Sequence, residues 1–450
     1  MKIPRLFAAL PLLLAGLGAS AAAADGIVTP EQLFPQLDAI LKRSVAQSPR
    51  MVSRAIDLEM AENNRISARS GLLPSVGGGY SFYKGEDDRS DMSGFVRVTK
   101  IYYSFSVVQP LFYWGDRRNG ARMGEIQQAI TQGQYREAYR LLAQEVRGSY
   151  LRLIQNKLIQ KKTAFNAELA RKAQAQAEER LVKKVISEAQ IIPIRLDAER
   201  AQISLERTNY EVESQKAAFA RLTGGPVLND DEIPDSIPVV ADLNEPVQHL
   251  LAGFLAQKEP VTAEAVEYRK KLEIERLGLL AQKNRLKPKF NLVVAATQDQ
   301  QSYTINIAQK YQVNSYYGGM SASWTIFDGF ASGAAVRNSL ARIRQMEGDY
   351  RSLTENLATQ AQTQAKLLGF SFRNASITDR LLVTGEGNLN YRSEQFSRGV
   401  IAEEDVNAAK QNFYDAQINA CASRADYLNQ LSGFLGLVRE DPVLANVTLK

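Results

Sequence analysis

The sequence has 450 residues, of which 45% are hydrophobic and 23% charged, with a formal net charge of +6. Charges of both signs are spread along helix-forming stretches, which is typical of solvated helix faces and argues against a nucleic-acid-binding patch. The length would accommodate two or three ordinary domains. A single cysteine, Cys421, excludes an intramolecular disulfide and is expected to be a small packing residue.

Residues 1–24 are expected to be a signal peptide. A short basic start, MKIPR, is followed by an apolar stretch and by a run of small residues, ASAAAAD. Ala22 and Ala24 satisfy the small-x-small rule, so we expect cleavage after Ala24. The apolar stretch is too short to span a membrane, which makes an N-terminal anchor the weaker alternative. No cysteine that could be acylated lies near the cleavage point, and no later apolar run of roughly 18 residues predicts a transmembrane helix.

Two stretches about 215 residues apart share one organisation. From Gln109 the chain reads QPLFYWGDRRNGARMG, and from Trp324 it reads WTIFDGFASGAAVRNS. Each runs from an apolar, aromatic segment through a glycine-containing turn into a long polar segment rich in helix formers. This spacing is far longer than that of solenoid repeats and predicts two copies of a large unit. The expected division is a first repeat at 25–225, an inter-repeat linker at 226–245, a second repeat at 246–436 and a C-terminal tail at 437–450. The linker is rich in proline and aspartate and has neither a helical nor a strand period.

In each repeat, helix-forming sequence gives way at a proline, Pro74 or Pro288, to two strand-like runs. Proline suits this boundary because it cannot continue a helix and extends the residue before it. The predicted strands are 75–84 and 98–112 in the first repeat, and 289–298 and 316–327 in the second. Apolar residues alternate with small or polar ones, and aromatic residues lie near the ends. Transmembrane β-strands show this pattern, but half-buried strands of a soluble sheet show it too.

The long helices favour the first alternative. From Arg117 to about Lys184 there is no proline, and glycine is scarce after Gly133, which predicts a rod on the order of 100 Å long. A second rod is predicted at 334–397, where apolar residues follow the three- and four-residue steps of coiled coils. A self-contained coiled-coil rod would leave the four strands without a role.

Each rod is expected to reverse into a returning helix. In the second repeat SRGVIAEEDVNAA supplies the turn, with Gly399 ending one helix and an acidic stretch from Glu403 beginning the next. In the first repeat the turn lies within KKVISEAQIIPIR, with Ser187 and Pro193 as alternative helix starts, and the repeats are expected to differ in register here by a few residues. The returning helices are predicted at about 194–222 and 406–431.

Four strands in one chain cannot close a membrane barrel. A four-stranded sheet has two edges, and unpaired backbone groups in hydrocarbon cost several kcal/mol each. Bacterial barrels start at about eight strands. Several chains must therefore contribute strands to one barrel, and three chains would supply twelve.

The same stretches resemble a known family. QPLFYWGDRR and WTIFDGFASGAAVR resemble the repeated strand-to-helix signature of the TolC family of outer-membrane efflux and secretion channels, and SRGVIAEEDVNAA is similar to its helix turn at the periplasmic tip. The resemblance covers essentially the whole mature chain. It implies a mainly α fold with a transmembrane β part, built from a duplicated helix–β-hairpin–long-helix-hairpin unit. A homotrimer would share one twelve-stranded β-barrel, continuous with a periplasmic α-helical barrel and an equatorial belt that includes the linker and the tail.

The resemblance also implies a function and partners. The protein would lie in the outer membrane, contact its lipid, extend into the periplasm, and serve as the exit channel for an inner-membrane transporter docked through a periplasmic adaptor (membrane fusion) protein. Missing acylation favours type I protein secretion with an ATP-binding-cassette transporter, because channels that serve proton-driven pumps are often acylated. Small-molecule or drug efflux for a proton-driven pump is the alternative, and a periplasmic coiled-coil adaptor or scaffold is an alternative of another class.

Functional residues are expected at the helical tips. By position, Asp405 matches an acidic residue that lines the closed periplasmic entrance in the family, but the next acidic position is Ala408 here. Glu403 or Glu404 would then supply further negative charge. In the alternative interpretation, Asp405 is only a helix N-terminal carboxylate matched to the helix dipole. The expected adaptor contacts are Lys184, Val185, Ser187, Gly399, Val400 and Ala402.

An exported enzyme is not predicted. His249 is the only histidine, which excludes a metal cluster built on several histidines, and beside leucines it is expected to be a packing residue. Carboxylates follow helix-face patterns without an isolated pair. The glycines at 77–79 lie in a predicted strand, where they indicate close packing or a bend rather than a phosphate loop. No cofactor, metal or nucleic acid is expected to bind.

Overall fold

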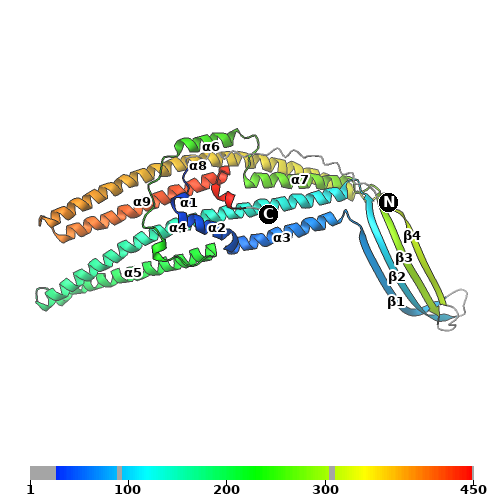
Figure 1. The fold of residues 1–450 in the computed structure, drawn as a ribbon, viewed down its shortest axis with the longest axis horizontal. Coiled ribbons are helices and arrows are strands. Elements are labelled where there is room, and N and C mark those ends of the chain that lie inside the picture. Colours follow the sequence, from blue (N-terminus) through cyan, green and yellow to red (C-terminus); the bar gives the residue numbers. More distant parts are fainter. Residues whose placement is uncertain (1–26, 89–93, 304–309, 448–450) are drawn as a thin grey trace, which may run out of the picture.

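The computed structural model describes residues 27–88, 94–303 and 310–447. The expected signal peptide at 1–24 lies outside the described residues, as does part of each loop predicted between paired strands. Figure 1 shows a long helical body with two helical tips at one end and a sheet that bends away from the other end. This mostly helical fold with a small sheet confirms the predicted fold class of the protomer.

The first repeat opens with three helices that each start at a proline. They are α1 (Pro30–Leu33), α2 (Pro35–Gln47) and α3 (Pro49–Ser70). Proline suits the first helical position because its ring fixes φ and its missing N–H has no helical partner there. The prolines therefore divide a continuously helix-forming stretch into three segments.

One antiparallel sheet joins the two repeats. Its strands β1 (Ser75–Asp88), β2 (Phe95–Phe112), β3 (Lys289–Tyr303) and β4 (Lys310–Ser323) pair in the order β1-β2-β3-β4. The first pair of strands is longer than the alternation predicts, because the hairpin continues through the Lys100–Asp87 ion pair of 2.9 Å. The fourth strand is shifted from the prediction, since it includes 310–315 and ends before Trp324. The pairing of β2 with β3 leaves β1 and β4 as the two edges.

Two helical hairpins of equal length form the rest of the body. The outgoing helices α4 (Asp116–Val182) and α8 (Ala331–Ser397) each have 67 residues, and the returning helices α5 (Glu188–Thr223) and α9 (Glu403–Val438) each have 36. Every boundary in the second hairpin follows its counterpart by 215 residues, as from 116 to 331 and from 223 to 438. The register difference expected at the tips is therefore wrong. No helix of the described chain is long and apolar enough to cross a membrane.

The main core lies at mid-length, where the chain segments outside the hairpins gather (Figure 1). The linker contributes the short helix η1 (Asp230–Glu232) and buried isoleucines, and the second repeat opens with α6 (Asn244–Ala256) and α7 (Ala263–Lys283). The last described element is η2 (Pro442–Asn446), which packs on α4. The linker therefore has more local structure than its sequence indicates.

Two single residues test the packing predictions. Cys421 on α9 is 3% exposed within the main core, which confirms its packing role. His249 is exposed on α6, so its predicted packing role is wrong. The buried positions of α6 are Val247, Leu250 and Phe254, and His249 lies on the other face of the helix.

Candidate functional site

The two hairpins turn at tips with the same backbone geometry. After α4, Lys184 takes a left-handed conformation with φ 56°, and after α8 the equivalent Gly399 has φ 74°. In both tips the N–H of the next residue, Val185 or Val400, donates to a carbonyl five residues earlier, at 2.8 and 3.0 Å. This bond is typical of a Schellman cap, which satisfies carbonyls at a helix end. Glycine suits the left-handed position because it has no Cβ, whereas Lys184 adopts it at a conformational cost.

The tips differ in how the returning helix begins. Ser187 caps α5, and its N–H donates to the side chain of Gln190 at 2.9 Å, so Ser187 and not Pro193 precedes the helix start. Ala402 holds the same position before α9 and has no side-chain acceptor. The first turn of α9 carries Glu403 and Glu404 together with Asp405.

The structure brings the three predicted acids of the second tip together. Glu403, Glu404 and Asp405 are all exposed, and within the described chain none of their carboxylates forms a hydrogen bond or an ion pair. The free N–H groups of a helix start favour negative charge, so the acids are stabilised there without a basic partner. Ala408, one turn further, is exposed and adds no charge. The tip therefore presents concentrated negative charge to solvent.

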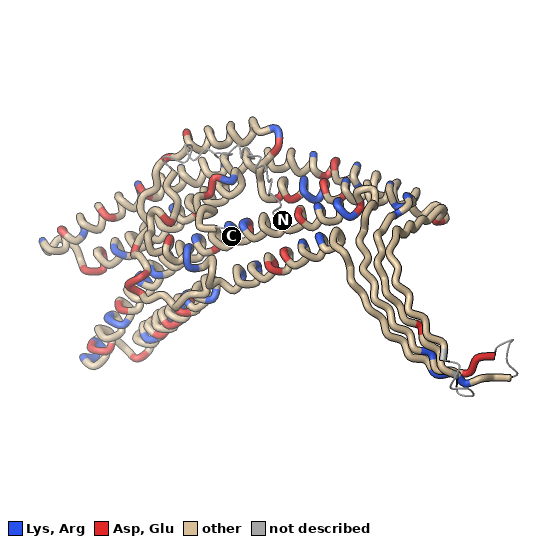
Figure 2. Tube along the Cα trace, turned by 45° about the vertical axis from the view of Figure 1, so that its right-hand side comes forward, with Lys and Arg blue, Asp and Glu red and all other residues tan. Residues whose placement is uncertain are grey.

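At the opposite end of the molecule the sheet has one apolar and one small-residue face. Val76, Val107 and Val294 are cross-strand neighbours on the first face. The adjacent row, Gly77 with Ser106 and Ala295, lies on the other face. Figure 2 shows that the strands are almost free of charge over most of their length and that charged residues gather at the ends away from the helices. Such an alternation with charge confined to the ends is typical of strands that face lipid on one side.

Comparison with known proteins supports the family resemblance. Residues 40–225, which cover the first helices, β1, β2 and the first hairpin, match the model of the family described as outer membrane efflux protein. Over these residues the chain is similar to outer membrane efflux proteins. The resemblance seen in the sequence is thereby confirmed, as is the location in the outer membrane with an extension into the periplasm. No curated protein sequence matches the chain.

Solved channels share the fold over nearly their whole length. The Campylobacter jejuni CmeC outer membrane channel is 13% identical with a TM-score of 0.72, and the match covers 98% of this chain and 94% of that one. VceC from Vibrio cholerae is 14% identical with a TM-score of 0.64, over 90% and 96% of the two chains. The Neisseria gonorrhoeae MtrE channel is 12% identical with a TM-score of 0.64, over 90% and 89%. At these identities the likeness shows a common fold.

The protein presents the expected adaptor-contact residues on its surface. Val185 and Val400 occupy equivalent positions at the two tips, and each is 68% exposed. The remaining predicted contacts are also exposed, namely Lys184, Ser187, Gly399 and Ala402. Exposed valines at both tips are apolar surface that a docked partner would cover. The role of these residues in adaptor contact stays a prediction.

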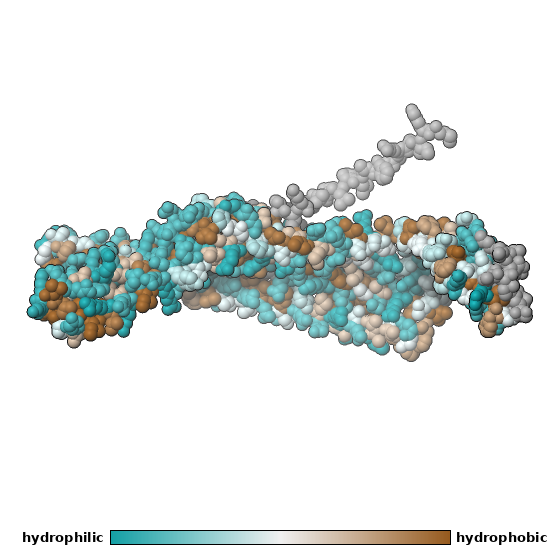
Figure 3. Space-filling view, turned by 90° about the horizontal axis from the view of Figure 1, so that it is seen from below, coloured by the Kyte–Doolittle hydropathy of each residue, from teal (hydrophilic) through white to brown (hydrophobic). Residues whose placement is uncertain are grey.

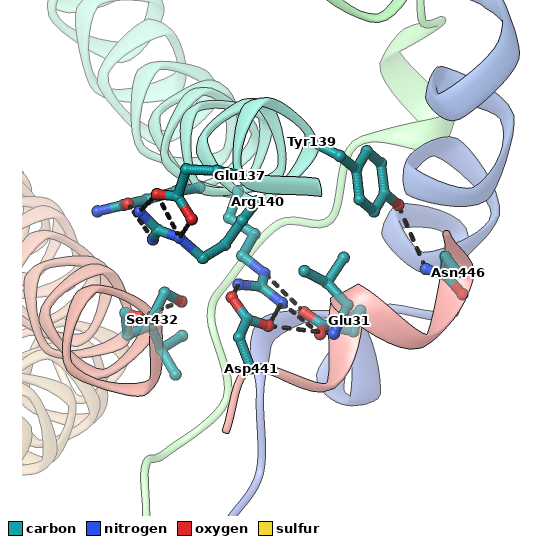
Figure 4. Close-up of polar contacts among 11 residues, drawn as sticks. Glu31, Glu137, Tyr139, Arg140, Ser432, Asp441 and Asn446 are labelled. Carbon is teal, nitrogen blue, oxygen red and sulfur yellow. Dashed lines mark hydrogen bonds and ion pairs between the residues drawn. The ribbon is translucent and has the colours of Figure 1, made fainter. Parts of the chain in front are cut away.

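Sequence reasoning missed a buried ionic network near mid-length (Figure 4). Arg147 on α4 is fully buried and donates to Glu31 of α1 at 2.5 and 2.9 Å and to Asp441 after α9 at 2.8 and 2.9 Å. Burial alone would lower the pKa of Arg147, but hydrogen bonds and charges from the two carboxylates raise it above its ordinary value. Nearby, Asn446 donates to Tyr139, whose hydroxyl donates to the Leu41 carbonyl. No local pattern distinguishes Arg147 from the other arginines of α4.

The acidic tip leads to a testable prediction about ion selectivity. Replacing Glu403, Glu404 and Asp405 together by Gln, Gln and Asn is expected to lower the cation-over-anion permeability ratio of channels in planar bilayers, by about two- to tenfold. The loss should shrink as salt is raised, because exposed charges are screened. A matched control is Glu188→Gln, which removes the exposed acid at the start of α5. An equal change in the control would show that the second tip has no special role.

The single thiol leads to a second prediction. Burial raises the pKa of Cys421 to about 11, so at pH 8 roughly one thiol in a thousand is ionised. Native protein is therefore expected to resist alkylation by iodoacetamide at pH 8 and to react fully once unfolded, as measured by intact mass. Because the folded-state pKa is raised, the thiol's contribution to stability is present below the unfolded pKa and is lost as pH rises above it. Rapid labelling of the native protein would contradict burial of this residue.

Proposed function

We propose that this protein is an outer-membrane channel of which three copies form one pore, with a twelve-stranded barrel above a periplasmic helical barrel. The observation that carries the proposal is the four-stranded sheet with free edges at β1 and β4. Unpaired backbone groups along these edges would be costly in hydrocarbon. Three sheets placed edge to edge, with β4 of one protomer beside β1 of the next, would satisfy them, and four strands alone are too few to close.

The helices support the same arrangement. Following the strand order, α3 contacts α4, α4 contacts α7, and α7 contacts α8, which leaves α3 and α8 at the two sides of a single layer. Figure 3 shows hydrophobic side chains on the surface at the tip end of the molecule. Exposed apolar residues on α5 and α8 include Ile192, Ile203, Tyr210, Phe370 and Leu381. Neighbouring protomers would cover part of this surface.

The exported cargo is proposed to be protein, delivered by an ATP-binding-cassette transporter through an adaptor docked at the tips. Family members are trimeric channels that work with periplasmic adaptors and inner-membrane pumps. In support of type I secretion, the only cysteine of the sequence is buried in the core and is not available for acylation. Small-molecule efflux is the second candidate, and the description of the matching family favours it. A periplasmic coiled-coil adaptor would leave the lipid-compatible sheet unexplained.

Two measurements test the proposal in order. Native mass spectrometry of protein extracted from outer membranes in detergent is expected to give a trimer, and a monomer recovered from the soluble periplasm would overturn the channel. The secreted proteome of a deletion strain is then compared with that of strains complemented by the wild type or by the Glu403, Glu404 and Asp405 variant. Loss of one or a few secreted proteins with unchanged drug susceptibility supports type I secretion. An unchanged secretome with raised drug susceptibility supports small-molecule efflux instead.

A further inference from the structure

The two repeats differ where a returning helix meets the next helix start. In the first repeat the end of α5 is closed against the start of α3. Gly224 takes a left-handed conformation with φ 72°, and a Cβ added to it would lie 2.0 Å from the Gln47 carbonyl oxygen. The Ser48 hydroxyl donates to the Leu222 carbonyl at 2.9 Å across the same junction. The two backbones are therefore in direct contact.

In the second repeat the equivalent position is an arginine. Arg439 follows Gly224 by 215 residues and has the same left-handed conformation, with φ 62°. Its guanidinium donates to the Val261 carbonyl at 2.9 Å. That carbonyl precedes Thr262, the N-cap of α7, as Gln47 precedes the N-cap of α3. In the second repeat the contact with the segment before the next helix is thus made by a charged side chain, whereas in the first repeat the two backbones touch directly.

Beside this junction lies a cavity of about 620 Å³ between α3, α4 and α7. Lys270 and Arg439 both line it. Lys270 donates to the Ala129 carbonyl at 2.9 Å, and in the described residues neither cation forms an ion pair with a carboxylate. Both side chains are only partly exposed. The cavity is therefore bounded by two cations whose charge is not neutralised by a direct partner.

The carboxylates of the cavity are largely engaged elsewhere. Glu137 forms an ion pair with Arg140 at 2.6 Å, and Glu267 forms one with Lys271 at 2.6 Å. Glu264 also lines the cavity. It is exposed on the first turn of α7, where the helix N-terminus stabilises its negative charge. The lining arginine on α3, Arg54, pairs with Asp57 at 3.0 Å.

The pKa values of Lys270 and Arg439 are both lowered, and burial is the largest cause for each. The positive charge of Arg136 lowers the pKa further at each group. At Lys270 the charge of Arg439 adds to the lowering, and the charge of Glu273 raises the pKa. At Arg439 the charge of Glu137 raises the pKa, and the charge of Arg140 lowers it further. A bound anion would relieve both the repulsion and part of the burial cost, since it would replace lost water with a charge-assisted partner.

We propose that this cavity binds a phosphate group between Lys270 and Arg439. Arginine offers a planar fork of donors that matches phosphate oxygens, and lysine adds a compact point charge. The volume exceeds that of phosphate alone, so the cavity accommodates either free phosphate or the phosphate of a larger headgroup, and both sources share the same contacts. The inference is independent of the cargo and of the trimer.

The test uses the purified full-length protein in neutral detergent at fixed ionic strength. Isothermal titration calorimetry is carried out with inorganic phosphate, with a short-chain phosphatidic acid, and with the matching phosphatidylcholine. Wild-type protein is expected to bind inorganic phosphate, phosphatidic acid, or both, and not phosphatidylcholine. Binding of phosphatidic acid alone would assign the site to a lipid headgroup, binding of inorganic phosphate alone to the free anion, and binding of both to the phosphate group itself.

Variants separate this site from non-specific attraction. Arg439→Gly restores the residue of the first repeat and suits the left-handed backbone, and Lys270→Met keeps the aliphatic stem. Each is expected to weaken binding about tenfold or more, as loss of a charge-assisted contact does. The control, Arg200→Gln, removes an exposed arginine of α5 and should leave binding unchanged. No binding by the wild type, or equal affinity in all variants, would overturn the proposal.

Discussion

Replacing Gly224 by alanine is expected to destabilise the protein by about 3–5 kcal/mol, an unusually large effect for a single added methyl group. The backbone is left-handed here, which costs roughly 1–2 kcal/mol for a residue with a Cβ. The larger part is steric, because the new Cβ would lie 2.0 Å from the Gln47 oxygen and 2.5 Å from its carbonyl carbon. Both atoms belong to Gln47, the last residue of α2 before the start of α3, so the clash can be relieved only by moving one helix end.

The control for Gly224→Ala is Gly399→Ala at the tip. Gly399 has nearly the same φ, 74°, but no atom outside its immediate chain neighbours lies within 4 Å of the position that a Cβ would occupy. The free energy of unfolding of Gly399→Ala should fall only by the cost of the left-handed backbone, about 1–2 kcal/mol. Urea unfolding followed by helical circular dichroism gives the midpoints, and reversibility is checked by refolding. Equal midpoints for the two variants would show that the junction in the first repeat is not closed as described.

Replacing Arg147 by methionine is expected to cost about 3–5 kcal/mol, because it leaves Glu31 and Asp441 as carboxylates in the core without a cation. The side chain of Arg147 is 0% exposed, and those of Glu31 and Asp441 are 10% and 1% exposed. The pKa of Arg147 is raised, so its contribution is present below the ordinary arginine pKa and is lost only above it. The deficit should therefore be constant from pH 6 to pH 9.

A surface arginine provides the comparison for Arg147. Arg200 and Asp197 form an ion pair of 3.1 Å on α5 with side chains 77% and 68% exposed, so Arg200→Met should change stability by less than about 1 kcal/mol. The double variant Arg147→Met with Asp441→Leu removes one stranded carboxylate and should recover part of the loss. Thermal or urea unfolding of all variants measures this coupling. If the stability lost by the double variant equals the sum of the losses caused by Arg147→Met and Asp441→Leu alone, the two residues do not act as one network.

Much of the fold follows from local patterns that any single sequence carries. Alternation at period two located the sheet, and long stretches without proline located α4 and α8, because both signals depend only on neighbouring residues. The duplication was visible at QPLFYWGDRR and WTIFDGFASG, since both copies need the same turn from strand to helix. The acidic residues Glu403, Glu404 and Asp405 could be predicted from the sequence, because a helix N-terminus favours carboxylates. The family resemblance rested on this order of elements.

Only the tertiary structure decided which residues meet across the chain. Arg147 and Asp441 are 294 positions apart, and Arg147 lies in a helix with many arginines, so no periodic signal marks their contact. His249 was misjudged because its leucine neighbours indicate an apolar segment but not which face is buried. Gly224 and Arg439 hold one position in two repeats, yet one lies at a closed backbone junction and the other lines a cavity. Local sequence determines the conformation of a segment, whereas burial and charge depend on what the folded chain places beside it.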